Sequence, residues 1–189
     1  MKTVVTLMMV LLLTVAGCGQ KEDSAGETKQ PSTSEAATAL DVDLHTAAAT
    51  GNIEAIRKHI EAGSDLNVRD KDGGACPLST AALFGQAEAA MALIEAGADI
   101  NCRGNDGATP LHVAAFFCRA KIVKALVDKG ADMTIKNSYG STPLGTVSAP
   151  FASVKPVYEH FAKTLAPMGV KLDLERIEAA RPEIAEMLK

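Results

Sequence analysis

Histidine and cysteine are the first residue types to examine for chemistry in this chain, and their spacing decides which reactions or metal sites they could support. The histidines are His45, His59, His112 and His160. Imidazoles ligate metals or transfer protons, but both uses need partners at fixed spacing, such as two histidines four residues apart on a helix. No two of them have that spacing, and a metal-binding or catalytic His59 has no partner in the sequence. The histidines therefore predict neither a metal site nor acid–base catalysis.

Motifs for other catalytic chemistry are also missing from the sequence. There is no Gly-x-Ser-x-Gly turn for a nucleophilic serine, no glycine-rich loop ending in Lys-Ser/Thr, and no Cys-x-x-Cys pair. The acidic residues recur at fixed positions along the chain, which is typical of solvated faces and turn caps. We therefore expect a protein that is not an enzyme and uses no cofactor.

The elements that must position these residues repeat along the chain. Four leucines, Leu44, Leu78, Leu111 and Leu144, are spaced 34, 33 and 33 residues apart. Thr-Pro-Leu or Cys-Pro-Leu surrounds the last three, and a Gly-x-Asp turn follows the first three at a constant distance. A fixed period of this size indicates a small unit stacked on copies of itself rather than a closed globule.

The third copy indicates why each unit should fold as a pair of helices. Thr109 can cap a helix, and Pro110 suits its first turn because the missing N–H costs little there. From about Ala120 apolar residues recur at the spacing of one helix face, and Gly130 ends that second helix.

The run Thr109-Pro110-Leu111-His112-Val113-Ala114 resembles the ankyrin repeat, whose hallmark is a turn followed by Thr-Pro-Leu-His-x-Ala. The resemblance covers residues 41–147 well and 181–189 loosely. It implies an all-α solenoid of helix-turn-helix units with projecting hairpin loops. It also implies that His45 and His112, which occupy the same repeat position, support the turn through hydrogen bonds.

The first and fourth copies depart from the pattern at the ends of the stack. Asp41 or Asp43 is expected to cap the first helix, and a polar His59 suits an end repeat with no neighbour on one side. In the fourth copy we expect an early end to the first helix, then helices over about 156–166, 172–180 and 181–188. Residues 148–189 are thus interpreted as a divergent fourth repeat with a helical insertion and a C-terminal cap.

Three of the four cysteines lie within the repeats. Cys76 replaces the motif Thr, Cys118 replaces a loop Gly, and Cys102 stands where other copies have valine or isoleucine. All three can be small apolar residues buried in the stack. If a disulfide forms, Cys76–Cys102 is the pair, because Cys118 belongs at the other end of the first helix. The sequence leaves both alternatives open.

Two sets of residues are the candidate partner-binding surface. The residues after each Ala-Ala pair lie near the concave groove of ankyrin units, and here they are Leu83-Phe84 and Phe116-Phe117. Either they form an exposed apolar patch, which would mark a binding site, or they pack under neighbouring helices or the C-terminal insertion. The hairpin tips complete the predicted contact set: Arg69, Asp70, Lys71, Asp72, Arg103, Asn105, Asp106, Lys136, Asn137 and Tyr139.

The N-terminal residues differ in kind from the repeats. An apolar run over 4–15 is too short to span a bilayer and precedes small residues, which predicts a signal peptide over 1–17. Val15-Ala16-Gly17-Cys18 resembles the bacterial lipobox, which implies lipid on Cys18; the alternative is an ordinary secretion signal. Gly19 resembles an outer-membrane address in the enteric sorting rule. Residues 18–40 are polar, which predicts a flexible linker.

Composition and charge limit the classes of partner that the protein is expected to bind. The formal net charge is −4 and there is no basic run, so nucleic acid is not expected. We predict a lipid-anchored module that binds an unidentified protein partner in the bacterial envelope, at the outer membrane facing the periplasm. The alternative is a small-ligand- or metal-binding envelope lipoprotein in which residues 148–180 form a lid, with a pocket lined by Tyr158, His160 and Phe116.

Overall fold

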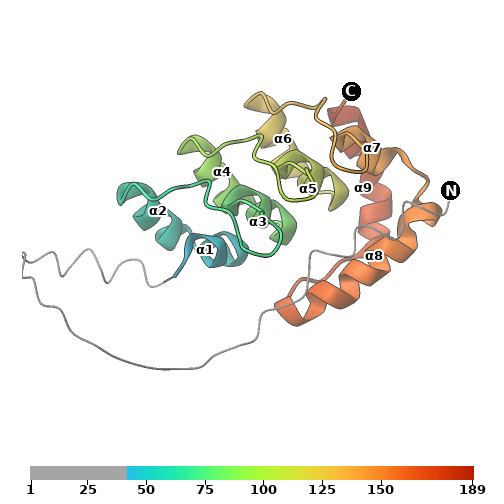
Figure 1. The fold of residues 1–189 in the computed structure, drawn as a ribbon. Helices are drawn as coiled ribbons and strands as arrows, with labels where there is room; N and C mark the ends of the chain where they lie inside the picture. The colour runs from blue at the N-terminus through green and yellow to red at the C-terminus, as the bar shows by residue number, and fades with distance from the viewer. Residues whose placement is uncertain (1–41) are drawn as a thin grey trace, which may run out of the picture.

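Helices stand in two parallel rows in the computed structural model, which describes residues 42–189. The front row in Figure 1 holds the first helix of each pair and the back row holds the second. The first three pairs are α1 (Leu44–Thr50) with α2 (Ile53–Glu61), α3 (Pro77–Phe84) with α4 (Ala87–Glu95), and α5 (Pro110–Phe116) with α6 (Ala120–Asp128). None of the residues from 42 onward forms a strand, so the predicted all-α stack is confirmed for this part of the chain.

The helices begin and end where the repeated residues predict. The Asp43 carboxylate caps α1 by accepting from the Thr46 amide at 3.0 Å, and Thr109 caps α5 immediately before Pro110. Gly51 ends α1 and Gly85 ends α3, with φ of 71° and 75°, in the left-handed region that glycine enters at little cost. Cys118 stands at the same repeat position with φ of 51°, the one positive value that the described residues show outside glycine.

Small residues bring the rows together. The alanine pairs of the first helices are sealed from solvent, as are the repeat leucines Leu78 and Leu111. Alanine has no side chain beyond Cβ, so neighbouring helices approach closely and bury each leucine between two units. Leu144 of the fourth unit is only half-buried, because no further unit covers it. The core is therefore a line of similar contacts that stops at the fourth unit.

The last unit differs from the prediction in its helix boundaries. After α7 (Pro143–Ser148), α8 runs over Phe151–Leu165 and includes Pro156, and a 3-10 turn follows at Ala166–Met168. α9 is one helix, Leu174–Met187, and includes Pro182, so the predicted break between 180 and 181 is wrong.

Both prolines are tolerated for the same physical reason. Each lies on the exposed side of its helix, and so do Ala152 and Glu178, whose carbonyls lose the partner that proline cannot provide. Those carbonyls can bond to water instead. The position of a proline relative to solvent, which the sequence pattern did not show, therefore decides whether the helix continues.

The last helix completes the back row. α9 packs against α6 and α7, where the second helix of a fourth unit belongs, and α8 lies in the interrupting segment 149–173. At the other end His59 is buried rather than bare, because its Nε2 donates to the Val42 carbonyl at 2.9 Å. Val42, two residues before α1, therefore bonds to the polar side chain at the position that the sequence assigned to an open end.

Predictions for the N-terminal residues stand outside this description. The signal peptide over 1–17, the lipid on Cys18 and the linker over 18–40 all fall before residue 42. Within 42–189, no helix has both the length and the apolar character that a bilayer crossing needs.

Candidate functional site

The hairpin loops form one continuous row because each bonds to the loop before it. The Asn105 amide donates to the Gly73 carbonyl at 2.8 Å, and the Ser138 amide donates to the Asp106 carbonyl at the same distance. Donors and acceptors are each 33 residues apart, so the period of the sequence is also the period of the row. The loop tips are thereby held as one surface rather than as separate loops.

Asparagine side chains make a second ladder at the base of the loops. The Asn67 side-chain oxygen accepts from the Asp99 amide at 2.8 Å, and that of Asn101 accepts from the Asp132 amide at 2.9 Å. Thr134 stands at the next repeat position, and its hydroxyl bonds to Asp132 within its own turn. The ladder therefore ends at the third loop, and it fixes the spacing between units on the way.

Three of the predicted tip residues turn inward to hold their own loops. One Asp70 carboxylate accepts from three backbone amides at 2.6–2.9 Å, and Asp106 accepts from the Ala108 amide at 3.0 Å. The Asn137 side-chain oxygen accepts from the amides of Tyr139 and Ser141, both at 3.0 Å. These side chains are committed to loop geometry, so we do not expect them to contact a partner directly.

Basic side chains are left on the outside of the same loops. Arg69, Lys71, Arg103 and Lys136 are all exposed, together with Asp72 and Asn105. Arg103 also donates to the Lys136 carbonyl at 2.9 Å, which joins two loops. Because Asp70 and Asp106 turn inward, the charged side chains that project outward from the tips are mostly basic, on a protein whose formal net charge is −4.

The predicted apolar patch at the C-terminal ends of α3 and α5 is only half present. Phe116 and Phe117 are 8% and 5% exposed, so the alternative that they pack under the C-terminal insertion is the correct one. Phe116 stacks on Tyr158 of α8 with ring centroids 4.5 Å apart, and Phe161 meets both phenylalanines edge-on at 5.6 Å. Leu83 and Phe84, at the same positions one unit earlier, stay half-buried.

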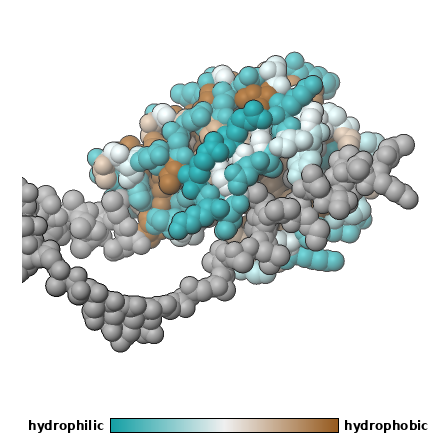
Figure 2. Space-filling model, in the orientation of Figure 1, coloured by the Kyte–Doolittle hydropathy of each residue, from teal (hydrophilic) through white to brown (hydrophobic). Residues whose placement is uncertain are grey.

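The surface seen in Figure 2 agrees with a small apolar area. Hydrophilic residues cover most of the visible face, and hydrophobic residues appear as separate spots among them. Among the residues that the structure describes, this face therefore has no extended hydrophobic surface. The exposed edges of Leu83 and Phe84 would act as anchors within a polar surround, which is the usual composition of a non-obligate interface.

The pocket expected beneath a lid does not form. Tyr158 is sealed from solvent and fills the space against Phe116, and its hydroxyl donates to the Phe116 carbonyl at 2.7 Å. His160 lies exposed on the other face of α8. Residues 148–180 thus pack onto the stack instead of closing over a cavity lined by these three side chains. Across residues 42–189, no group of metal-binding side chains comes together.

The two motif histidines support the turns, as predicted. His112 Nδ1 lies 3.2 Å from the Thr109 amide, which can only donate, and Nε2 lies 2.9 Å from the Ser141 carbonyl, which can only accept. The proton therefore sits on Nε2 of a neutral ring. His45 joins the Thr80 hydroxyl and the Val68 carbonyl, each at 3.1 Å. Both rings therefore join their own repeat to the next one through hydrogen bonds.

Protonation of His112 should destabilise the fold. Burial lowers the pKa of His112 below its ordinary 6.5, and a proton on Nδ1 would face the Thr109 N–H. The unfolded chain takes up that proton first, so stability present above pH 6.5 should be lost as pH falls through the lowered folded value. Chemical unfolding at several pH values measures this. The profile should flatten in His112→Gln, whereas an equal profile for this variant and the natural chain would contradict the assignment.

Of the two alternatives for the cysteines, the structure has the Cys76–Cys102 disulfide. Cys76 and Cys102 form a disulfide, which ties the start of α3 to the loop after α4. Cys118 is free and buried, and burial raises the pKa of its thiol to about 11. A thiol with that pKa carries almost no thiolate, the nucleophilic form, at neutral pH. Cys118 serves as a small packed residue in a position otherwise held by glycine.

Sequence reasoning missed one buried charge. Arg181 of α9 is 4% exposed and donates to the Ala149 carbonyl, the Tyr158 hydroxyl and the Thr146 carbonyl, at 2.6, 2.8 and 3.5 Å. It joins α7, α8 and α9 at one point. No sequence pattern distinguishes this arginine from the exposed ones, since its burial depends on how the insertion folds back.

Repeated helix pairs, loops bonded in a row and a shared line of leucines define a helical-repeat solenoid. Comparison with known proteins specifies which kind. Residues 44–137 match the family model described as ankyrin repeats, in three copies, and this segment belongs to the ankyrin repeat family.

A solved structure supports the same assignment. The chain is 31% identical to the ankyrin repeat domain of Bcl-3, described as a unique member of the IkappaB protein family, with a TM-score of 0.53. The likeness covers 55% of this chain and 45% of that chain, so the chain spans less than half the length of the relative it matches. No curated protein sequence matches this chain.

Proposed function

We propose that this protein is a protein-binding module and not an enzyme, and that its partner binds along the hairpin row. The observation that carries the proposal is the sorting of charge at the tips. Asp70 and Asp106 bond inward, while Arg69, Lys71 and Lys136 project outward. Such a row fits a partner with an acidic surface, because complementary charge steers association and sets register.

Apolar anchoring comes from the edge of the second unit. Leu83 and Phe84 keep part of their side chains in contact with solvent, and the equivalent residues of the third unit are covered by α8. Binding energy in interfaces is concentrated in a few aromatic and arginine side chains. We therefore place the centre of the interface at the second unit, between Phe84 and the tips that carry Arg69 and Arg103.

Charge reversal tests this surface. The full chain with Arg69→Glu and Lys71→Glu should lose capture of an envelope protein that the natural chain retains after cross-linking. Both side chains are exposed and neither has a hydrogen bond or ion pair to residues 42–189, so the fold should be unchanged. The matched control is Lys121→Glu with Lys155→Glu, two exposed lysines on α6 and α8. Retention by the first variant, or equal loss in both, would contradict the proposed interface.

The site of action that we propose is the bacterial envelope, with a lipid on Cys18 and residues 18–40 as tether. Support comes from the lipobox resemblance of residues 15–18 and from the Cys76–Cys102 disulfide, a bond that persists outside the reducing cytosol. Cys18→Ala should move the protein from the membrane fraction to the soluble one and abolish labelling by a radioactive fatty acid. Unchanged labelling would exclude Cys18 as the lipid site.

A further inference from the structure

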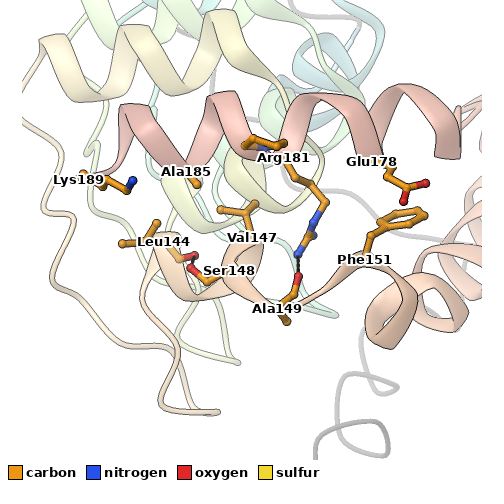
Figure 3. A pocket seen from close by; sticks show the side chains of 10 residues that line it. Leu144, Val147, Ser148, Ala149, Phe151, Glu178, Arg181, Ala185 and Lys189 are labelled. Carbon is orange, nitrogen blue, oxygen red and sulfur yellow. Dashed lines mark hydrogen bonds between the residues drawn. The ribbon is translucent and has the colours of Figure 1, made fainter.

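A cleft opens at the C-terminal end of the stack, away from the hairpin row. It has a volume of about 470 Å³ and lies between α7, the start of α8 and α9 (Figure 3). This volume falls within the range of roughly 300–1,000 Å³ that small-molecule sites occupy. The side chains that line it are Leu144, Val147, Ser148, Ala149, Phe151, Glu178, Arg181, Pro182, Ala185 and Lys189.

The cleft exists because the stack stops. In the earlier units the repeat leucine is covered by the next pair of helices, but Leu144 faces the cleft and is half-exposed. Val147 and Phe151 continue the apolar wall from α7 into α8 (Figure 3). Pro182 and Ala185 line the cleft from α9. An apolar substituent placed here would gain the burial that a fifth unit would otherwise supply.

Arg181 places a positive charge in this apolar setting. Its three acceptors, two carbonyls and the Tyr158 hydroxyl, are all neutral, and none of the ion pairs formed between described residues involves it. Glu178 lies one turn earlier on α9 and also lines the cleft, but it makes no ion pair with Arg181. A buried cation without a counter-charge is costly, so an anion at this point would relieve an existing penalty.

The guanidinium also keeps hydrogen-bonding capacity for an anion. Of its five N–H groups, Nη1 uses its two on Tyr158 and Thr146, and Nη2 uses one on Ala149. The Nε N–H has no acceptor among residues 42–189. It is not fully sealed from solvent, so it stays available to a ligand. Nε and Nη2 form one edge of the arginine fork, and that edge matches the two oxygens of a carboxylate.

We propose that this cleft binds a carboxylate that carries an apolar substituent, with Arg181 as its counter-charge. Arg181 is the buried cation of the lining, and Lys189, which also lines the cleft, is already paired with Glu186. The site therefore fits a singly charged, planar group better than a phosphate, which needs more donors. The carboxylate can belong to a free organic acid or to the C-terminus of an apolar peptide. The site is distinct from the hairpin row, so it does not depend on the function proposed above.

Titration with matched acids and amides tests the site on the full chain. Hexanoate should bind about tenfold or more tightly than hexanamide, because only the acid supplies the charge that the arginine lacks. Backbone amide signals of residues 144–149 and 182–189 should shift on binding. Acetyl-leucyl-leucine and its C-terminal amide form the second pair. Preference for hexanoate would point to a free acid as the ligand, and preference for the dipeptide acid would point to a peptide terminus.

Arg181 is not a suitable site for a test mutation, because it joins three helices and its loss endangers folding. A substitution that fills the cleft tests the site instead. Ala185→Phe places a ring in the cleft and should weaken hexanoate binding at least tenfold, measured against the natural chain. Ala92→Phe is the control, a half-buried alanine of α4 outside the cleft. Equal binding of acid and amide, no shift near Arg181, or undiminished binding by Ala185→Phe would overturn the proposal. So would self-association through this end that Ala185→Phe abolishes while hexanoate fails to bind.

Discussion

Replacing Leu111 with alanine should lower the free energy of unfolding by about 2–5 kcal/mol, the range for truncating a buried leucine. Leu111 is 0% exposed on α5, which packs against α3 on one side and α7 on the other. Both neighbouring helices are fixed by their packing in the stack and by the bonds between loops, so neither can move in to fill the space. Urea unfolding followed by far-ultraviolet circular dichroism measures the change.

The same substitution at Leu144 is the matched control. Leu144 holds the equivalent position in the fourth unit but is half-buried, because its outer side faces the cleft. Leu144→Ala removes the same atoms and leaves no closed cavity, so the loss should be smaller, about 1 kcal/mol. A loss at Leu111 no larger than that at Leu144 would contradict the stacked core.

Those two leucines also indicate why so much of the fold could be predicted. A repeat of fixed length makes each unit's neighbour a copy of itself, so one local pattern determines both the helices and what they pack against. Thr109, Pro110 and Gly85 set helix ends by local geometry alone. The bonds between loops follow from the same period. Nothing beyond neighbouring units is needed to predict them.

The interruption in the fourth unit follows no such rule. Whether Phe116 and Phe117 face solvent depends on α8, which begins 34 residues after Phe117 and repeats nothing. The burial of Arg181 depends on the same segment, through the carbonyls of Thr146 and Ala149 and the Tyr158 hydroxyl. Long-range packing of a unique segment has no periodic signal, so the sequence leaves these side chains undecided.

The predicted contact residues fall into two groups, those that hold their own turn by hydrogen bonds and those that extend into solvent. Aspartate and asparagine in a turn accept from nearby backbone amides, which competes with any contact to a partner. Asp70, Asp106 and Asn137 do this, whereas long basic side chains cannot accept and so extend into solvent. Lysine and arginine at the tips are therefore the better candidates for binding, and the geometry of each turn explains the rest.

Truncating Phe117 to alanine should cost about 3–5 kcal/mol, as expected for a buried phenylalanine. Phe117 lies under α8, meets Phe161 edge-on at 5.6 Å and Phe116 at 5.0 Å, and is 5% exposed. Its loss removes contacts that fasten the insertion to the third unit. Thermal and urea unfolding of the full chain measure the cost, and α8 should become more accessible to proteases before the repeats unfold.

Phe84 provides the comparison, since it stands at the same repeat position one unit earlier and is half-buried instead of sealed. Phe84→Ala makes the same chemical change on a half-buried ring, so it should cost only about 1–2 kcal/mol. Partner capture should show the opposite order, with Phe84→Ala weakening it and Phe117→Ala leaving it intact below the unfolding temperature. If the two variants lose stability equally, α8 does not cover Phe117. If neither affects capture, the second unit is not the centre of the interface.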